Sequence, residues 1–271
     1  MFLLFDIGGT HTRFTTSQDG KEIGEVTLIS TFKNFEEGIL RLEKFADEET
    51  KGEKIIAAAG GIAGSLDHEK TMLVGSPHIP GWTGKPLKKA LEDIMNAPVF
   101  LENDAALAGL GEAVFGAGQK FQIMVYITIS TGIGGARIVD KKIDKNALGF
   151  EPGQQVIDYK NEASIESIIS GSALERRFNK KAYEITDEAI WEEEARILAY
   201  GLHNGIMHWS PEGIVLGGSM ILKKPGIDIE RVRFHLKKIL KNFLELPQVT
   251  EASLGDYGGL YGALTYVQQQ K

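Results

Sequence analysis

Three short glycine-containing turns, each beside an apolar run rich in β-branched residues, occur in a fixed order along the chain. They are Asp6-Ile7-Gly8-Gly9-Thr10, Thr131-Gly132-Ile133-Gly134-Gly135 and Leu216-Gly217-Gly218-Ser219. Glycine lets a backbone turn tightly and bring its N–H groups against phosphate oxygens. Each turn alone is also what an ordinary hairpin needs. Together, with Asn103-Asp104 between the first two, they indicate a phosphate-binding cleft between two related domains.

The size and charge of the chain limit the classes of partner. With 271 residues the chain can form two hydrophobic cores, since single cores tend to split above ~250 residues. Its net charge of −7 argues against a nucleic-acid or acidic-membrane partner, which would require a basic face. An acidic protein can still bind ATP, because backbone N–H groups and magnesium supply a local positive field.

The chain contains no cysteine, which excludes disulfides, thiolate nucleophiles and thiolate zinc sites. The opening run Met1–Phe5 is apolar but meets Asp6 at once, so it is too short for a secretion signal. No later run approaches the ~20 apolar residues of a membrane span. We therefore expect a cytoplasmic protein.

Strand and helix patterns alternate along the chain, which is typical of an α/β architecture. The first half predicts an antiparallel meander, an amphipathic helix after Asn34, and two further strands, at residues 2–6, 12–17, 23–29, 54–59 and 98–101. The second half repeats the plan with strands at 123–129, 136–139, 213–216 and 247–253, and helices at 164–178, 186–208 and 227–243. Two similar meanders predict a duplicated fold, with domains at 1–103 and 104–257 and a closing helix at about 258–271 that packs back on the first domain.

The glycine turns are the predicted ATP site. Asp6 is expected to hold a hydrated magnesium ion that bridges the phosphates. The first two turns supply opposing donors, and the third lets a flat adenosine approach a bare backbone. The predicted ATP-binding residues are Asp6, Gly8, Gly9, Thr10, Thr131, Gly132, Ile133, Gly134, Gly217, Gly218 and Ser219.

Asp104 is the candidate general base. Phosphoryl transfer to a sugar hydroxyl needs a carboxylate within hydrogen-bond reach of that hydroxyl. An aspartate at a helix start is more often only a cap, so the order of the motifs around Asp104 carries this prediction.

In these segments the sequence resembles the ROK family of sugar kinases, within the superfamily of hexokinase, actin and Hsp70-like ATP-binding folds. The resemblance covers nearly the whole chain and rests on residues 6–10, 60–64, 77–82, 102–105, 111–118, 128–135, 216–219 and 259–263. It implies two ribonuclease H-like α/β domains with an interdomain active-site cleft, and a homodimer. The implied activity is ATP-dependent phosphorylation of a hexose or N-acylhexosamine, usually at the 6-hydroxyl. The sugar-binding residues that it implies are Gly64, His78, Asn103, Asp104, Glu151, Gln154 and Glu166.

The sequence departs from the family pattern at two places in the sugar pocket. Glu151-Pro152-Gly153-Gln154 replaces the common Glu-x-Gly-His, whose histidine also binds zinc in many members, and no cysteine follows. We therefore expect no zinc site. His78 stands where the family often has asparagine. Glu151, Glu166 and Gln154 can still exchange hydrogen bonds with sugar hydroxyls.

Glucose is the first candidate substrate, by family frequency, and N-acetylmannosamine, N-acetylglucosamine and fructose stay open. Two other classes of protein compete with the kinase. A transcriptional regulator of the family would carry an N-terminal winged helix, and the phosphate turn at residue 6 predicts none here. A sugar-binding regulatory protein with weak catalysis would explain Gln154, but the presence of Asp104 argues for an enzyme.

Overall fold

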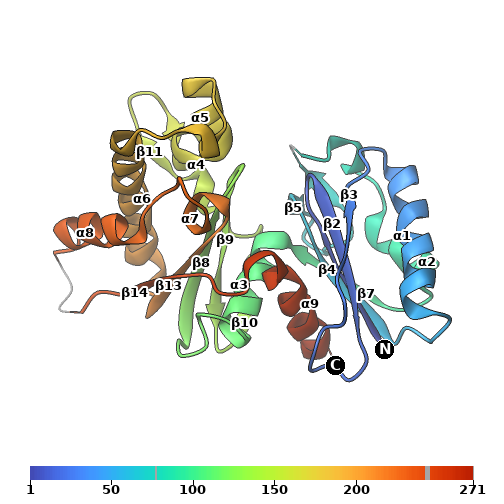
Figure 1. Cartoon of the computed structure of the whole chain (residues 1–271). Coiled ribbons are helices and arrows are strands. Elements are labelled where there is room, and N and C mark those ends of the chain that lie inside the picture. The colour runs from blue at the N-terminus through green and yellow to red at the C-terminus, as the bar shows by residue number, and fades with distance from the viewer. Residues whose placement is uncertain (77, 242–244, 271) are drawn as a thin grey trace. The chain divides into compact units, whose positions relative to one another are not determined.

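The structure is a computed structural model that describes residues 1–76, 78–241 and 245–270. The chain forms two compact units, each with its own sheet and helices (Figure 1). The first unit comprises Met1–Val114, Lys145–Gly149 and Asp256–Lys271, and the second comprises Phe115–Asp144 and Phe150–Gly255. Pro77 of the predicted sugar-facing loop and residues 242–243 of a predicted helix lie outside the described residues.

The first unit is built on a five-stranded sheet in the order β3-β2-β1-β4-β7. β1 runs antiparallel to β2 and parallel to β4, which in turn runs parallel to β7. The apolar opening run forms β1 at the centre of the sheet, where its side chains are almost fully buried. The strands are β1 (Phe2–Ile7), β2 (His11–Ser17), β3 (Thr27–Ser30), β4 (Ala57–Ile62) and β7 (Val99–Asn103), with the small ladder β5 (Ser65–Leu66) and β6 (Leu73–Gly75).

Helices cover both faces of this sheet, α1 and α2 on one and α3 and α9 on the other (Figure 1). Asn34 begins α1 as predicted, because its side chain accepts the N–H of Glu37 at 3.0 Å. Phe45 of α1 stacks on Phe14 of β2 with 5.4 Å between ring centroids, inside one buried apolar cluster. The helices are α1 (Phe35–Thr50), α2 (Leu87–Met95), α3 (Asp104–Val114) and α9 (Gly258–Gln269), with a 3₁₀ turn at Pro80–Trp82.

The second unit repeats this plan with the sheet order β10-β9-β8-β13-β14. β8 and β9 form an antiparallel hairpin, and β13 and β14 add in parallel. The strands are β8 (Ile123–Ile129), β9 (Ile133–Val139), β10 (Lys142–Ile143), β13 (Gly213–Gly217) and β14 (Gln248–Glu251), with the ladder β11 (Val156–Asp158) and β12 (Ala163–Ser164). The helices are α4 (Ile165–Ile169), α5 (Gly171–Phe178), α6 (Glu188–Trp209), α7 (Ser219–Leu222) and α8 (Ile229–Ile239), with 3₁₀ turns at Pro152–Gln154 and Ala182–Glu184. A further 3₁₀ turn, Gly255–Tyr257, begins at the last residue of the second unit and continues into the first.

The predicted boundary between residues 103 and 104 differs from the structure, which groups α3 with the first unit. The reason is a close backbone contact between α3 and α9. A Cβ on Gly111 would lie 2.2 Å from the carbonyl oxygen of Gly258, and one on Gly262 would lie 1.8 Å from that of Leu107. These glycines let α9 lie directly on α3, so α3 stays with the sheet that α9 covers.

The predicted helix at 164–178 is also two helices. Ser170 ends α4 in extended conformation and caps α5, accepting the N–H of Ala173 at 3.1 Å. None of the helices that the structure describes is long and apolar enough to span a lipid bilayer.

Candidate functional site

The first glycine turn joins β1 to β2 and is a braced hairpin. The N–H of Gly8 donates to the carbonyl of His11 at 2.9 Å. The hydroxyl of Thr31 donates to the carbonyl of Gly8 at 2.8 Å, and the N–H of Thr31 donates to that of Thr10 at 2.9 Å. Because the N–H of Gly8 is used inside the hairpin, the donors to a phosphate would have to come from Gly9 and Thr10.

His78 packs against this turn. A Cβ on Gly9 would lie 2.5 Å from the Cβ of His78, so only glycine fits there without movement. The ammonium of Lys33 donates to the carbonyl of His78 at 2.9 Å and also to that of Gly9. The structure thus joins a predicted sugar-binding residue to a predicted ATP-binding turn. Sequence reasoning missed Lys33, because nothing in its neighbourhood of the sequence singles it out.

Asp6 lies at the end of β1 with its side chain 16% exposed. One guanidinium nitrogen of Arg13 lies 3.6 Å from its carboxylate, and another lies 3.6 Å from Asp256. Burial raises the pKa of Asp6 to about 6, although Arg13 opposes the shift, and the nearby Asp256 adds to it. A Cβ on Gly259 would lie 3.3 Å from the carboxyl carbon of Asp6, which brings the start of α9 against this side chain.

Asn103 and Asp104 lie where β7 gives way to α3. The amide oxygen of Asn103 accepts the N–H of Ala106 at 3.1 Å, and its amide nitrogen donates to the carbonyl of Gly64 at 3.2 Å. Asp104 accepts the N–H of Ala105 at 2.8 Å. The structure therefore brings Gly64, Asn103 and Asp104 together.

Gly61 makes room for Asp104, because a Cβ on Gly61 would lie 3.0 Å from the Cα of Asp104. Gly61 is also the register partner of Asp6 on one side and of Glu102 on the other. Asp6 and Asp104 consequently lie at the same end of the same sheet. The carboxyl ends of parallel strands are where open α/β sheets place their ligands.

The second glycine turn joins β8 to β9 and is supported by α5. The N–H of Ser130 donates to the carbonyl of Gly132 at 2.9 Å. The N–H groups of Gly171 and Ser172, at the start of α5, donate to the carbonyls of Ser130 and Thr131 at 2.7 and 3.2 Å.

Glu166 and Gln154 meet at the same turn. One carboxylate oxygen of Glu166 accepts the N–H of Ile133 at 2.6 Å, and the other accepts the side-chain amide of Gln154 at 3.1 Å. A Cβ on Gly153 would lie 2.4 Å from the carbonyl of Ile133, so the 3₁₀ turn that follows Glu151 packs on the glycine turn. Glu166, predicted for sugar, therefore binds a turn predicted for phosphate, and Gln154 is joined to that turn through Glu166, a connection that sequence reasoning missed.

The third turn, at the end of β13, is explained by packing alone. A Cβ on Gly217 would lie 2.4 Å from the hydroxyl of Tyr126, and one on Gly218 would lie 2.3 Å from the carbonyl of Ile129. Gly218 has φ 87°, which also favours glycine. Both glycines and Ser219, which begins α7, thus have a structural reason that requires no ligand.

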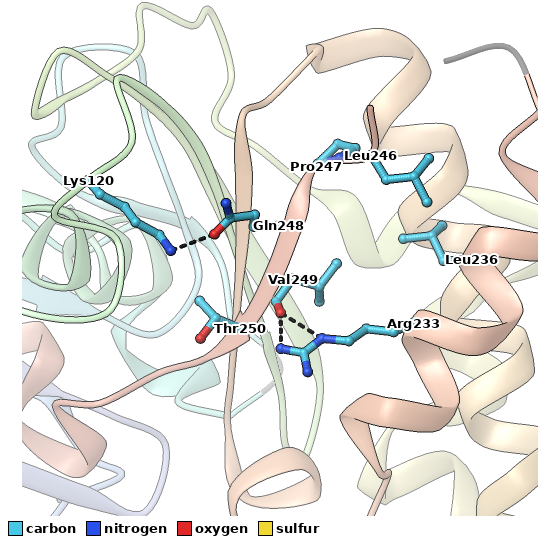
Figure 2. A pocket seen from close by; sticks show the side chains of 8 residues that line it. All are labelled: Lys120, Arg233, Leu236, Leu246, Pro247, Gln248, Val249 and Thr250. Carbon is cyan, nitrogen blue, oxygen red and sulfur yellow. Dashed lines mark hydrogen bonds between the residues drawn. The ribbon is translucent and has the colours of Figure 1, made fainter. Parts of the chain in front are cut away.

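One pocket of the second unit lies beside the edge strand β14 (Figure 2). Lys120 donates to the side chain of Gln248 there, and Arg233 donates to the carbonyl of Val249 at 2.9 Å. None of the predicted site residues lines this pocket. Within the described residues, no group of three or more histidine, aspartate or glutamate side chains could hold a metal ion.

Comparison with known proteins decides the family. The profile of the ROK family matches residues 3–270. The chain belongs to the ROK family. Its structure is similar to that of a ROK hexokinase from Thermus thermophilus, with a TM-score of 0.87, 29% identity and 99% of both chains covered.

Two further relatives are glucokinases. The glucokinase of Thermotoga maritima is 32% identical over 189 residues, which cover 66% of this chain and 59% of that protein. A ROK glucokinase from Streptomyces griseus, solved with glucose and AMPPNP, has a TM-score of 0.81 at 24% identity, with 99% of both chains covered. The ROK resemblance and the α/β fold predicted from the sequence are thereby confirmed.

Proposed function

We propose that this ROK-family sugar kinase transfers the terminal phosphoryl group of ATP to the 6-hydroxyl of a hexose, with glucose as the first substrate to test. The observation that carries the proposal is the placement of Asp104. It begins α3 at the carboxyl end of the sheet, directly above Gly61 and beside Asn103. A carboxylate in that position can accept the proton of an attacking hydroxyl.

The first unit supplies the base and part of each ligand site in this proposal. Asn103 binds sugar hydroxyls with the hydrogen-bonding capacity left after its bonds to Ala106 and Gly64. His78 and Gly64 line the same sugar site. Gly9 and Thr10 donate their N–H groups to phosphate oxygens.

The second unit supplies the remaining groups. Glu151, Gln154 and Glu166 accept hydrogen bonds from sugar hydroxyls, and Gln154 also donates. The backbone of residues 131–134 contributes to the phosphate site in this proposal. Gly217, Gly218 and Ser219 form the adenosine surface, a role that the packing of both glycines neither requires nor prevents.

A hydrated magnesium ion fits Asp6, because magnesium is bound in nucleotide sites by one or two carboxylates plus phosphate oxygens and water. Asp6 offers one partly exposed carboxylate at the mouth of the first turn. When bound, the ion would neutralise charge on the phosphates. The chain's own contribution to the reaction is positional: Asp104 accepts the hydroxyl proton at its carboxylate while the sugar is held in line.

The decisive experiment measures ADP release with magnesium–ATP and a panel of glucose, mannose, fructose, N-acetylglucosamine and N-acetylmannosamine. We expect one of these sugars to stimulate ADP release, and Asp104→Asn to reduce turnover by about a thousandfold, while sugar binding measured by calorimetry is kept. Asp93→Asn is a matched control, since Asp93 is a surface residue paired with Lys89. Full turnover in Asp104→Asn would refute the assignment of the base.

A second candidate is a sugar-binding protein that turns over little ATP. One observation favours it: the N–H of Ile133, which was predicted to contact phosphate, is taken by Glu166. Calorimetric sugar binding without ADP release for any sugar of the panel would support this candidate over the kinase.

A further inference from the structure

A partly buried ion pair adjoins the segment that carries Asn103 and Asp104. Its acid is Glu102, the residue before Asn103 on β7, whose side chain is 8% exposed. Its cation is Lys70, whose side chain is 34% exposed and whose ammonium contacts one carboxylate oxygen of Glu102. The other oxygen of Glu102 accepts the N–H of Asn103 at 2.9 Å. One carboxylate therefore joins Lys70 to the backbone that leads into Asp104.

The backbone around Lys70 is fixed by its own turn. The backbone of Lys70 has φ 54°, a left-handed conformation that is uncommon for residues other than glycine. Its N–H donates to the carbonyl of Asp67 at 2.9 Å. The carboxylate of Asp67 accepts the N–H groups of Thr71 and Met72 at 2.5 and 2.9 Å. Lys70 thus reaches Glu102 from a rigid turn and not from a free loop.

Helix α9 closes the other side of the pair. The ammonium of Lys70 lies 5.7 Å from the ring centroid of Tyr266, within the range of a cation–π contact. Partial burial acts to lower the pKa of Lys70, but the Glu102 carboxylate outweighs it and the pKa is raised. The same helix begins against Asp6, through Gly259. Helix α9 therefore contacts both Lys70 and Asp6, and the Lys70–Glu102 pair adjoins the segment that leads into Asp104.

We propose that Lys70 is a positioning residue: by neutralising Glu102 it holds the Glu102-Asn103-Asp104 segment in the geometry in which Asp104 accepts the proton. This proposal rests on the proposed function, because it assigns Lys70 to the same reaction. In this proposal Lys70 acts through Glu102, which its ammonium contacts, and not on the substrate itself.

The two partners respond differently to loss of the other. Without Lys70, Glu102 is a buried carboxylate with no cation, and an uncompensated buried charge is strongly unfavourable. Without the charge of Glu102, Lys70 can turn its ammonium toward solvent along its flexible stem. When both charges are removed, no unpaired ion remains.

A double-mutant cycle tests this asymmetry. We expect Lys70→Met to lower kcat by about 100-fold, the scale of a displacement near 1 Å in a catalytic group, with the KM for magnesium–ATP changed less than about threefold. Glu102→Gln should cost only about threefold. The double variant Lys70→Met/Glu102→Gln should recover about tenfold over Lys70→Met alone, because the pair is coupled. Lys70→Arg should restore most of the activity, and Lys89→Met, which breaks a surface pair, serves as the matched control.

Two results would overturn the proposal. One is a double variant as impaired as the product of the two single effects. The other is a Lys70→Met enzyme whose loss is confined to the KM for ATP, which would make Lys70 a nucleotide ligand.

Amide hydrogen exchange of the full chain gives a readout that does not depend on turnover. Backbone exchange in residues 102–106 should rise in Lys70→Met and return toward the wild-type rate in the double variant. If the wild-type protein phosphorylates no sugar, the proposed function fails, yet this exchange pattern still decides whether Lys70 positions the segment. Unchanged exchange in all variants would refute the positioning role. If Lys70→Met does not fold, the Lys70→Arg and double variants carry the same comparison.

Discussion

The two sheet hairpins that carry the glycine turns have the same topology, and protein donors engage backbone carbonyls in both, but the second also gives an N–H to a carboxylate side chain. In the first, protein donors engage the backbone carbonyls of residues 8–10: Thr31 bonds Gly8 and Thr10, and Lys33 bonds Gly9. In the second, a protein acceptor, the Glu166 carboxylate, takes the N–H of Ile133. Since the carboxylate of Glu166 occupies an N–H of the second turn and places a negative charge beside it, the first turn is the better anion site. The second turn is hydrogen-bonded to Glu166, and through it to Gln154, which are both proposed to bind sugar.

The largest difference should appear when the two turns are crowded by one methyl group. Gly9→Ala places a Cβ 2.5 Å from the Cβ of His78, which lies close to a backbone and cannot yield easily. We expect kcat/KM for magnesium–ATP to fall by about 100-fold. Gly132→Ala meets only the tip of the Glu166 side chain, at 2.8 Å, and should cost about tenfold in the same assay. Equal losses in the two variants would contradict the comparison.

A buried acid, Glu194, is linked to the second turn through α5. α5 supports this turn, and Arg177 of α5 bonds Glu194 of α6 at 2.8 Å. Glu194 is fully buried, one of its oxygens has no partner among the described residues, and burial raises its pKa to about 7 although Arg177 opposes the shift.

The stability that this acid controls should fall as the pH rises. Since the folded state binds the proton more tightly than the unfolded state, stability is lost between pH 4.5 and about 7 and is flat above it. The loss should be about 2–3 kcal/mol, after a discount for the exposed Arg177. Urea unfolding at pH 5 and pH 8 measures it, and Glu194→Gln should remove most of this difference. A wild-type pH dependence that Glu194→Gln leaves intact would assign the effect to other groups.

Glu166→Gln sharpens the comparison at the second turn. The amide has the same shape but lacks the negative charge to which the N–H of Ile133 and the side-chain amide of Gln154 donate. Because this side chain touches both predicted sites, we expect the KM values for sugar and for ATP to rise together, each by about tenfold, the loss of one hydrogen bond to a charged group. Initial rates with each substrate varied in turn provide the measurement. A rise in the sugar KM alone would show that the bond to Ile133 has no role in nucleotide binding.

Thr31→Val makes the matching change at the first turn and should have the smallest effect. It removes the hydroxyl that bonds Gly8 and the hydroxyl of Thr12, at 2.8 and 2.9 Å, while keeping the side-chain volume. We expect the KM for ATP to rise by about threefold, the KM for sugar to stay unchanged and stability to fall by about 1 kcal/mol. A change in the sugar KM would indicate that the first turn, like the second, is coupled to the sugar site.

The sequence predicted the parts of the fold that local patterns determine. The buried run Phe2–Ile7, the cap at Asn34 and the repeated hairpin each follow from periodicity and turn chemistry within a few residues. The sequence did not predict the unit to which α3 belongs, because that depends on a close contact with α9, which lies more than 140 residues later in the chain. Such contacts leave only isolated glycines in the sequence.

The same limit applies to the candidate site. Asp6, Gly9 and Asp104 were recognisable from their motifs, and the structure places the first and third at one end of one sheet. Lys33, Lys70 and Arg13 were not recognisable, since a single cation in a loop or strand gives no sign of the distant carbonyl or carboxylate that it meets. The bond from Glu166 to Ile133 was missed for the same reason.

The three-part composition of the first unit has a consequence for synthesis of the chain. Its sheet and α3 are translated early, but α9, which lies on α3 through bare glycine backbone, follows the whole of the second unit. On the ribosome the second unit can complete its sheet while the first unit still lacks helix α9. Helix α9 therefore completes the first unit last. Until α9 is synthesised, α3, which begins with Asp104, has an uncovered apolar face to which a chaperone can bind.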